Sequence, residues 1–235
     1  LVKPGGKGGD DLLLTPTERK ARPRVVAVRA SEAPTLDGKL DDAVWRNADA
    51  ADRFKPADTW NADKPVEHPT EARFAWDGDN LYLAIRAFEP DLERVVSTMV
   101  GPAQSQSGED HVQFFLDIGR EYATNRYFGY NFPASGMHLG VYGKMGDIGS
   151  TEMTIREGRE TGERSAWTLE IAIPWSTLLS DNWRKLTVKE PAPGLDMAMN
   201  LRRYRMADPE ETSMWSRSEP SVTGMPWRWG TLVLE

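Results

Sequence analysis

Ser107-Gly108-Glu109-Asp110-His111-Val112-Gln113-Phe114-Phe115-Leu116-Asp117 is the stretch of sequence that decides the fold. It begins as an acidic turn and continues as a strand-like segment in which Val112, Phe114 and Leu116 recur at every second position. A period of two puts these three apolar side chains on the same face of a β-strand. The stretch therefore predicts a strand with one buried face, entered from a turn at the rim of a β-sandwich.

The same pattern continues on both sides of this strand. Segments Glu71–Trp76 and Leu81–Phe88 flank Asp77-Gly78-Asp79-Asn80, a hairpin turn whose Gly and Asn tolerate positive φ. Asp41 is placed to cap a short helical turn that carries Val44 and Trp45 inward. Further strands are predicted at Arg24–Ala30, Arg126–Phe132, Gly149–Arg156, Trp167–Ile173, Asp196–Tyr204 and Trp229–Leu234. No long helices alternate with them, so we expect an all-β fold, one antiparallel two-sheet β-sandwich of jelly-roll or immunoglobulin-like type.

Composition narrows the class of protein. The chain has 235 residues, 39% of them hydrophobic, which suffices for one sizeable core. Its formal charge of −7 is spread along the chain, which argues against nucleic acid as a partner. No apolar run is long enough for a membrane span, and without cysteine there is no disulfide or thiolate metal site.

The chain divides into an arm and one domain. Residues 1–23 are rich in Gly, Pro and charge and are predicted to be a linker or N-terminal arm, followed by a single domain over residues 24–235. Because the sequence starts with Leu1 rather than Met, we expect a processed product or a piece excised from a longer protein. A signal peptide would lie outside this sequence.

Catalytic motifs are missing. The sequence contains no nucleophile elbow, phosphate-binding glycine loop or His-Glu-x-x-His, and none of His68, His111 and His138 stands in a recognisable catalytic context. Carboxylates suited to glycoside hydrolysis are present, so a glycan-active enzyme stays an alternative. These are Glu109, Asp110, Asp117, Glu210 and Glu211.

Calcium is the only metal that the residue types favour, because it takes oxygen ligands from carboxylates and carbonyls in loops. Asp77, Asp79 and Asn80 have some of the required groups, but a hairpin turn explains their spacing better. Asp110, together with other carboxylates of the rim, is the preferred candidate ligand.

Tryptophans indicate where a sugar would bind, since an indole ring stacks on the apolar face of a pyranose. We assign Trp45, Trp167, Trp215 and Trp229 to the core and leave Trp76 and Trp175 open. The tryptophans in polar, Gly- or Pro-bounded loops are candidates for a solvent-facing platform, with Trp227 preferred. They are Trp60, Trp183 and Trp227.

Several ordered patches resemble the family 9 carbohydrate-binding modules. They include Leu36-Asp37-Gly38 with Trp45, Trp76-Asp77-Gly78-Asp79-Asn80-Leu81-Tyr82-Leu83, the stretch Glu109–Asp117, Asn131 with Gly136, Trp167–Pro174, Asn200-Leu201-Arg202, Trp215-Ser216 and Trp229-Gly230-Thr231-Leu232. The resemblance implies a β-sandwich attached to polysaccharide-degrading enzymes, with a glycan end held between two tryptophans and with structural calcium.

This chain departs from that family at the sugar clamp. Ser107 stands where the family has a clamping Trp, and Gln113 stands where it has an acid after the Val of the motif. Trp227 lies closer to Trp229-Gly230 than the spacing of the second clamping Trp implies. The resemblance places the glycan on a rim formed by the Gly108–His111 turn and the Thr223–Trp227 loop. The predicted ligand-binding residues are Asp110, Gln113, Trp227 and Arg203, with Trp60 as the next candidate platform.

The sequence thus predicts a non-catalytic carbohydrate-binding module that recognises a poly- or oligosaccharide outside the cytoplasm, extracellular or periplasmic, as part of a larger polysaccharide-processing or cell-surface protein. Other domains of that protein are its expected partners. One alternative is a structural scaffold that has lost sugar binding. A haem-binding relative is a further alternative, resting on Met137, Met145 and Met153 with Lys144 and His138 nearby.

Overall fold

A computed structural model describes residues 22–57, 64–98, 108–120, 127–136, 139–142, 153–180, 186–216 and 226–235, with the side chains of residues 139–142 and 227 left out. Most of the predicted arm therefore lies outside the described residues, as do Trp60, Trp183 and most of the methionine cluster proposed for haem. The described chain is built of strands with a few short helical turns, which confirms the all-β prediction.

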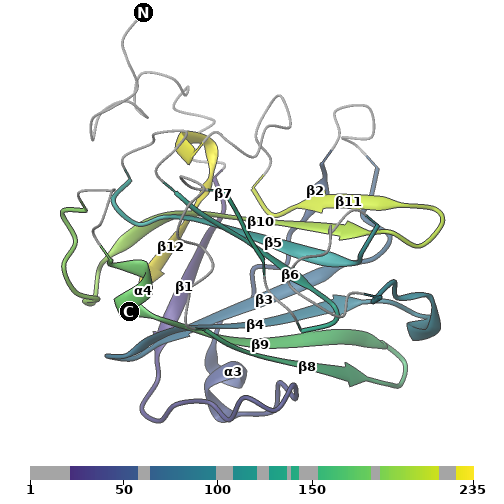
Figure 1. Ribbon diagram of the computed structural model, residues 1–235, viewed down its shortest axis with the longest axis horizontal. Helices are drawn as coiled ribbons and strands as arrows, with labels where there is room; N and C mark the ends of the chain where they lie inside the picture. The colour runs from purple at the N-terminus through teal and green to yellow at the C-terminus, as the bar shows by residue number, and fades with distance from the viewer. Residues whose placement is uncertain are drawn as a thin grey trace, which may run out of the picture.

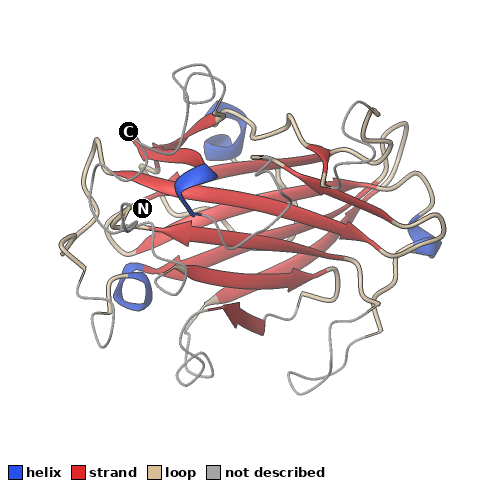
Figure 2. Cartoon of the chain, turned by 90° about the horizontal axis from the view of Figure 1, so that it is seen from above, coloured by secondary structure: helices blue, strands red, loops and turns tan. Residues whose placement is uncertain are grey.

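The strands form two layers that face each other across the core (Figures 1 and 2). One layer has the order β7-β6-β5-β10 and the other β3-β4-β9-β8, and β12 and β1 join them through the hydrogen-bonded path β10-β12-β1-β3. The bounds in the first layer are β7 Leu139–Tyr142, β6 Phe128–Pro133, β5 His111–Asp117 and β10 Asp196–Arg205. In the second layer they are β3 Thr70–Trp76, β4 Asn80–Phe88, β9 Ala166–Pro174 and β8 Thr154–Glu160. The joining strands are β12 Gly230–Leu234 and β1 Arg24–Arg29, while β11 Glu211–Met214 and β2 Lys55–Pro56 extend from β10.

Strand β1 corrects the prediction of a purely antiparallel sandwich. It pairs in parallel with both β12 and β3, for example Val25 with Leu232 and Ala27 with Phe74. Parallel neighbours need a long connection rather than a tight turn, and residues 30–69 supply it between β1 and β3. The alternation in β1 was readable from the sequence, but its direction relative to distant strands was not.

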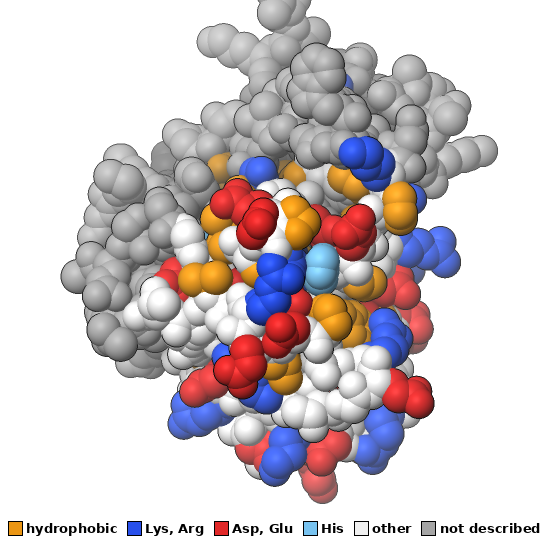
Figure 3. All heavy atoms as spheres, turned by 90° about the vertical axis from the view of Figure 1, so that its right-hand side faces the viewer, with side chains coloured by type: hydrophobic (Ala, Val, Ile, Leu, Met, Phe, Trp, Pro, Cys, Tyr) orange, Lys and Arg blue, Asp and Glu red, His pale blue; other side chains and the backbone are white. Residues whose placement is uncertain are grey.

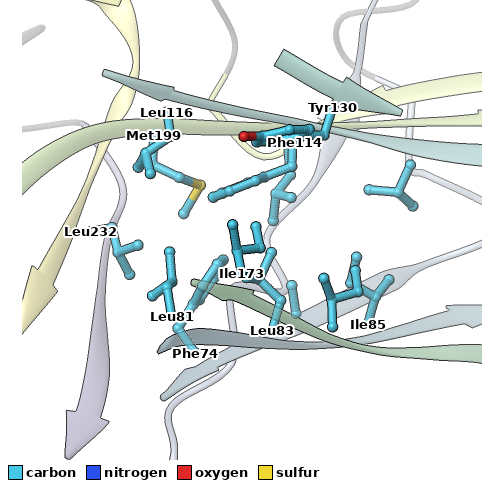
Figure 4. Packing of buried hydrophobic residues seen from close by; sticks show 14 of the residues in the cluster. Phe74, Leu81, Leu83, Ile85, Phe114, Leu116, Tyr130, Ile173, Met199 and Leu232 are labelled. Atoms are coloured by element: carbon cyan, nitrogen blue, oxygen red, sulfur yellow. The ribbon is translucent and has the colours of Figure 1, made fainter. Parts of the chain in front are cut away.

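The core lies between the layers and uses the alternating positions that the sequence predicted. Figure 4 shows Phe114, Leu116 and Met199 from one layer pointing toward Leu81, Leu83 and Ile173 from the other. Trp167 and Trp215 belong to this core, and so do Trp76 and Trp175, which the sequence left open. Trp45 and Trp229 are buried in two smaller clusters on the outer faces of the layers. The core assignment of four tryptophans is therefore confirmed.

The predicted hairpin joins β3 to β4. The Asp77 carboxylate accepts the main-chain N–H groups of Asp79 and Asn80, both at 2.8 Å, and so closes the turn. Neither Gly78 nor Asn80 has a positive φ, so the turn does not use the conformational freedom that we expected of them. Its four residues form a turn and not a metal loop, because the Asp77 carboxylate is already bonded to the main-chain N–H groups of the turn.

Among the described residues, helical structure is confined to short turns. The predicted helical turn is α3, Ala43–Asn47, and its N-cap is Asp42, one residue later than expected. The others are α4 Trp175–Leu178, η1 Leu92–Arg94 and η3 Pro226–Arg228. In the part of the chain that the structure describes, no helix is long and apolar enough to span a membrane.

Candidate functional site

The outer face of the β6-β5-β10 layer is polar where its inner face is apolar. Because Val112, Phe114 and Leu116 of β5 point into the core, His111, Gln113 and Phe115 point outward. The paired positions on β6 and β10 share this side, since residues directly opposite in an antiparallel ladder point the same way. We call this surface the Gln113 face; its members are His111, Gln113, Phe115, Asn131, Asn200, Arg202 and Tyr204.

A row of three polar side chains crosses the Gln113 face. Asn131 of β6 pairs with Gln113 of β5, which pairs with Arg202 of β10. With neighbouring strands about 4.8 Å apart, the row is roughly 10 Å long. We call these three residues the polar row. One small ligand is able to contact all of them.

The polar row carries unused hydrogen-bonding capacity. Gln113 and Asn131 are only 7% and 5% exposed, and Arg202 is half-buried. The Oδ1 atom of Asn131 and the Nε atom of Arg202 are buried without a hydrogen-bond partner among the described residues. Buried polar groups are normally paired, so an orphaned pair of this kind needs an explanation, and a bound ligand is one.

The side-chain amide of Asn200, on the same face, has a hydrogen-bond partner for its nitrogen and for its oxygen. Its Nδ2 donates to the Ser216 carbonyl at 2.8 Å and its Oδ1 accepts from the Ser216 N–H at 2.9 Å. Both bonds fix residue 216 against β10. Asn131 has no equivalent partner in the described chain, which sets it apart as a group available to a ligand.

Rings lie next to the polar row. His111 and Tyr204 stack with their centroids 4.5 Å apart and their planes 14° from parallel, and the Arg202 guanidinium lies 4.5 Å from the Tyr204 centroid. Burial lowers the pKa of His111, and the charge of Arg202 lowers it further against the opposing effect of the Glu109 carbonyl. His111 is therefore neutral at pH 7 and forms an uncharged platform with Tyr204.

The acidic turn before β5 fastens the rim of the sandwich. The Asp110 carboxylate accepts the Val96 N–H at 2.7 Å, and the Asp110 N–H donates to the Val96 carbonyl at 2.9 Å. The Glu109 carboxylate accepts the Thr98 N–H at 2.9 Å. Burial raises the pKa of Asp110, while the bond from Val96 and the charge of Arg203 oppose that rise. Both acids hold the Val95–Thr98 segment.

A calcium ion does not fit Asp110 as this structure has it. The side chain is 1% exposed, and its oxygens accept main-chain N–H groups, which a cation would have to displace. Within the described ranges, no group of three or more His, Asp or Glu side chains is arranged to hold a metal. Calcium stays a prediction, and Asp110 is a poor ligand for it.

Arg203 lies on the opposite side of β10 from Arg202, inside the sandwich. Its side chain is 1% exposed and donates to the carbonyls of His68, Pro69 and Phe88 at 2.7–2.9 Å. Burial lowers the pKa of Arg203 to about 10, although the charge of Asp110 opposes this. The structure thus gives Arg203 the task of joining the two layers. The arginine on the outer face is Arg202, which the sequence analysis did not select.

A buried ion pair accompanies Arg203 at this end of the sandwich. Arg205 donates through Nε to Glu89 at 2.6 Å, and both side chains are 2% exposed. Arg205 also donates to the carbonyls of Ala207 and Pro209. Burial acts to raise the pKa of Glu89, but the hydrogen bonds and charge of Arg205 outweigh it and lower the pKa. Outside this pair, Figure 3 shows acidic and basic side chains interspersed over the surface at this end.

The loop tryptophans are not placed by the structure. Trp60 and Trp183 lie outside the described residues, and for Trp227 only the backbone is described, within η3. Of the predicted ligand-binding residues, Gln113 is on the candidate face, Asp110 is at its rim and Arg203 is on the inner side. Asn131 and Arg202 were not predicted to bind ligand; the sequence analysis named them only within the patches that resemble the family. What identifies them as candidate site residues is their pairing with Gln113 on the neighbouring strands.

A hollow of about 460 Å³ lies on the other layer, between the Asp37–Asp41 segment and β8. Its charged side chains include Lys39, which pairs with Asp37 at 2.8 Å, and Arg86, which pairs with Glu160 at 2.6 Å. No aromatic ring lines it. Sugar stacking needs such a ring, so the Gln113 face is the better candidate site.

Known proteins resemble this chain in family and in fold. The model of the carbohydrate family 9 binding domain-like family matches residues 36–235. A family 9 carbohydrate-binding module from Caldicellulosiruptor kristjanssonii, solved with cellotriose, has a similar fold, with a TM-score of 0.61, 16% identity and coverage of 91% of this chain and 94% of that one. The same module was solved with glucose, at a TM-score of 0.59. A candidate carbohydrate-binding protein from Bacteroides uniformis is similar at a TM-score of 0.60 and 18% identity, covering 90% of this chain and 99% of that one. No curated protein matches the sequence significantly.

Proposed function

Because this chain belongs to the carbohydrate family 9 binding domain-like family, we propose that it is a non-catalytic carbohydrate-binding module that holds its glycan on the Gln113 face. The observation that carries the proposal is the polar row, three side chains in register, two of which, Asn131 and Arg202, have a buried polar atom that the described chain leaves unpaired. Sugar hydroxyls both donate and accept, so they complement two amides and a guanidinium.

The ring pair beside the row supplies the apolar part of such a site. The His111–Tyr204 stack is next to Gln113 and Arg202 along the strands, and an uncharged ring face suits the C–H side of a pyranose. Trp227 and Trp60 remain candidate platforms on the basis of their sequence context alone, as tryptophans in predicted loops. The binding partners that we propose are poly- and oligosaccharides, in agreement with the cellotriose and glucose bound by the similar module.

Binding without catalysis agrees with the state of the rim carboxylates. Glu109 and Asp110 hold main-chain N–H groups of the Val95–Thr98 segment, so neither is poised as a general acid or nucleophile toward the outer face. We place the domain outside the cytoplasm, extracellular or periplasmic, where a larger protein would use it to stay on polysaccharide. Structural calcium is part of this proposal through the family resemblance alone.

Calorimetric titration with glucose, cellotriose and a wider glycan panel tests the function. We expect dissociation constants from millimolar to micromolar, about −4 to −8 kcal/mol, for at least one glycan. Gln113→Ala and Asn131→Ala should each weaken binding by about 0.5–1.5 kcal/mol, the net value of one hydrogen bond. Because both side chains are buried, the melting temperature of each variant is measured as well, so that a loss of folded protein is separated from a loss of binding.

Arg73→Ala is the matched control, because Arg73 lies on the outer face of the other layer and contacts Glu71. It should leave binding unchanged. In the same titrations, Trp227→Ala tests the predicted platform, with an expected loss of about 1–3 kcal/mol. If the parent protein binds no glycan, the scaffold alternative replaces this proposal; if it binds and the Gln113 and Asn131 variants bind equally well, the site lies elsewhere.

A further inference from the structure

Arg202 has no acidic partner among the described residues, unlike three other arginines of the chain. Arg205 pairs with Glu89, Arg86 pairs with Glu160, and Arg120 lies 3.3 Å from Asp196. Arg202 makes no ion pair and no hydrogen bond within the described ranges, and its guanidinium stacks on the Tyr204 ring. A half-buried cation without an anionic or carbonyl partner has lost part of its hydration and received little in return.

Tyr204 fixes the plane of that guanidinium. The carbon at its centre lies 4.5 Å from the ring centroid, within the range of a cation–π contact. Such stacking occupies a face of the guanidinium and leaves the N–H groups at its edge available. The edge presents a fork of parallel donors, which matches the two oxygens of a carboxylate.

Few charged side chains lie near Arg202 on the described part of the Gln113 face. The two other members, Gln113 and Asn131, are neutral amides. On the same side of β5, Glu109 is bound to Thr98, and Asp117 lies four residues from Gln113, about 13 Å along the strand. On the side of β10 away from β5, Arg202 pairs with Met214 of β11, and Met214 pairs with Lys55 of β2. Arg202 is therefore the one charged member of the polar row, in a protein whose formal charge is −7.

We propose that the polar row binds a sugar carrying a negatively charged oxygen group, in which the Arg202 fork takes the charged group while Gln113 and Asn131 bind hydroxyls. A uronate carboxylate and a sulfate ester share this chemistry. The inference rests on the proposed function, since it names the class of glycan that the same face selects. A charged oxygen group would give the Arg202 guanidinium an ionic partner, whereas a neutral sugar would offer it hydroxyl acceptors only.

Matched sugar pairs test this selectivity. We would titrate the protein with glucose, glucuronate and glucose 6-sulfate, and with galactose and galacturonate, at low and high salt. The acidic member of a pair should bind about ten- to a hundredfold more tightly than the neutral one, the range expected for a hydrogen bond to a charged group. The advantage should shrink as salt rises. Comparison of glucuronate with glucose 6-sulfate separates the two sources of the charge.

Arg202→Gln removes the charge and keeps a hydrogen-bonding amide, so it should abolish the preference for the acidic member of each pair. The preference is a ratio within one variant, so a change that affects both members of a pair equally does not alter it. Arg202→Lys keeps the charge but loses the fork, and it should retain only part of the preference. Arg73→Gln is the control, since that arginine lies on the other layer beside Glu71. Circular dichroism and melting temperature verify that each variant is folded.

The titrations have three outcomes that would contradict the inference. Equal or weaker binding of the acidic sugars by the parent protein overturns the inference while neutral binding still supports the proposed function. A preference that survives in Arg202→Gln also overturns it. Failure of the parent to bind any sugar overturns the proposed function and the inference together. Should Arg202→Gln not fold, the salt dependence of the parent protein's preference for uronates still tests the role of charge.

Discussion

Glu170 shows how a single side chain positions a segment distant in sequence. Its carboxylate accepts the N–H groups of Asp37 and Gly38, each at 2.9 Å, and the indole N–H of Trp45 at 2.8 Å. The Asp37-Gly38 turn is thereby held against β9 and β8, and Gly38 takes a φ of 81° there. A Cβ at Gly38 would overlap the Glu157 carbonyl, so only glycine allows this approach. Burial raises the pKa of Glu170, and its three donors oppose that rise.

Replacing Glu170 by alanine should destabilise the protein by at least about 2 kcal/mol, because three buried donors lose their acceptor. Urea unfolding followed by tryptophan fluorescence measures the change. Glu160→Ala is the control, since Glu160 forms a partly exposed pair with Arg86 and should cost at most about 1 kcal/mol. Equal costs for the two variants would mean that the Glu170 bonds do not hold the segment.

At the scale of elements, β10 separates two tasks by the alternation of its side chains. Arg202 and Tyr204 belong to the Gln113 face, whereas Arg203 and Arg205 point inward and bind groups of the other layer. The two sets are one residue apart in sequence. Substitutions on β10 should therefore be able to change ligand binding and the contacts between the two layers separately.

The buried Glu89–Arg205 pair gives a test of the inner set. Glu89→Leu leaves the Arg205 charge without its carboxylate and should cost about 3–5 kcal/mol of stability. The double variant Glu89→Leu/Arg205→Met removes both charges and should be more stable than Glu89→Leu alone. Chemical unfolding of the parent, both single variants and the double variant completes the cycle. Additive losses would show that the two side chains are not energetically coupled.

Taken as a whole, the molecule has a core closed by two layers, with polar clusters at its end and on its faces. Inside the sandwich, Glu89 pairs with Arg205, and Arg203 donates to three carbonyls, although its Nε atom has no partner among the described residues. On the outer face, two atoms of the polar row, Asn131 Oδ1 and Arg202 Nε, are buried without a hydrogen-bond partner in the described chain. Unpaired polar groups cost stability, and a binding function gives a reason to keep them.

The prediction of structural calcium is tested by measuring the stability of the protein with and without the ion. If the family's calcium is present, melting temperature should be higher in millimolar calcium than in chelator, with a gain of about 2.7 kcal/mol at a hundred times the dissociation constant. Because the Asp110 carboxylate is occupied by main-chain N–H groups, Asp110→Asn should keep whatever calcium effect the parent shows. Loss of that effect in Asp110→Asn would place the ion at Asp110 against our expectation, and no effect in the parent would remove calcium from the account.

The sequence alone predicted the long strands of both layers, the buried face of several of them and the family, because period two and turn chemistry are local properties of the chain. It did not predict the short strands β2, β7 and β11, and it placed β8 at Gly149–Arg156 where the structure has Thr154–Glu160. Val112, Phe114 and Leu116 needed no neighbour to mark the inner face of β5, and this also placed Gln113 outside. What only the tertiary structure decided was register and direction. Arg202 rather than Arg203 faces Gln113, and β1 runs parallel to β12 and β3. A shift of one residue in pairing sends every side chain to the opposite face, and strands distant in sequence set that pairing.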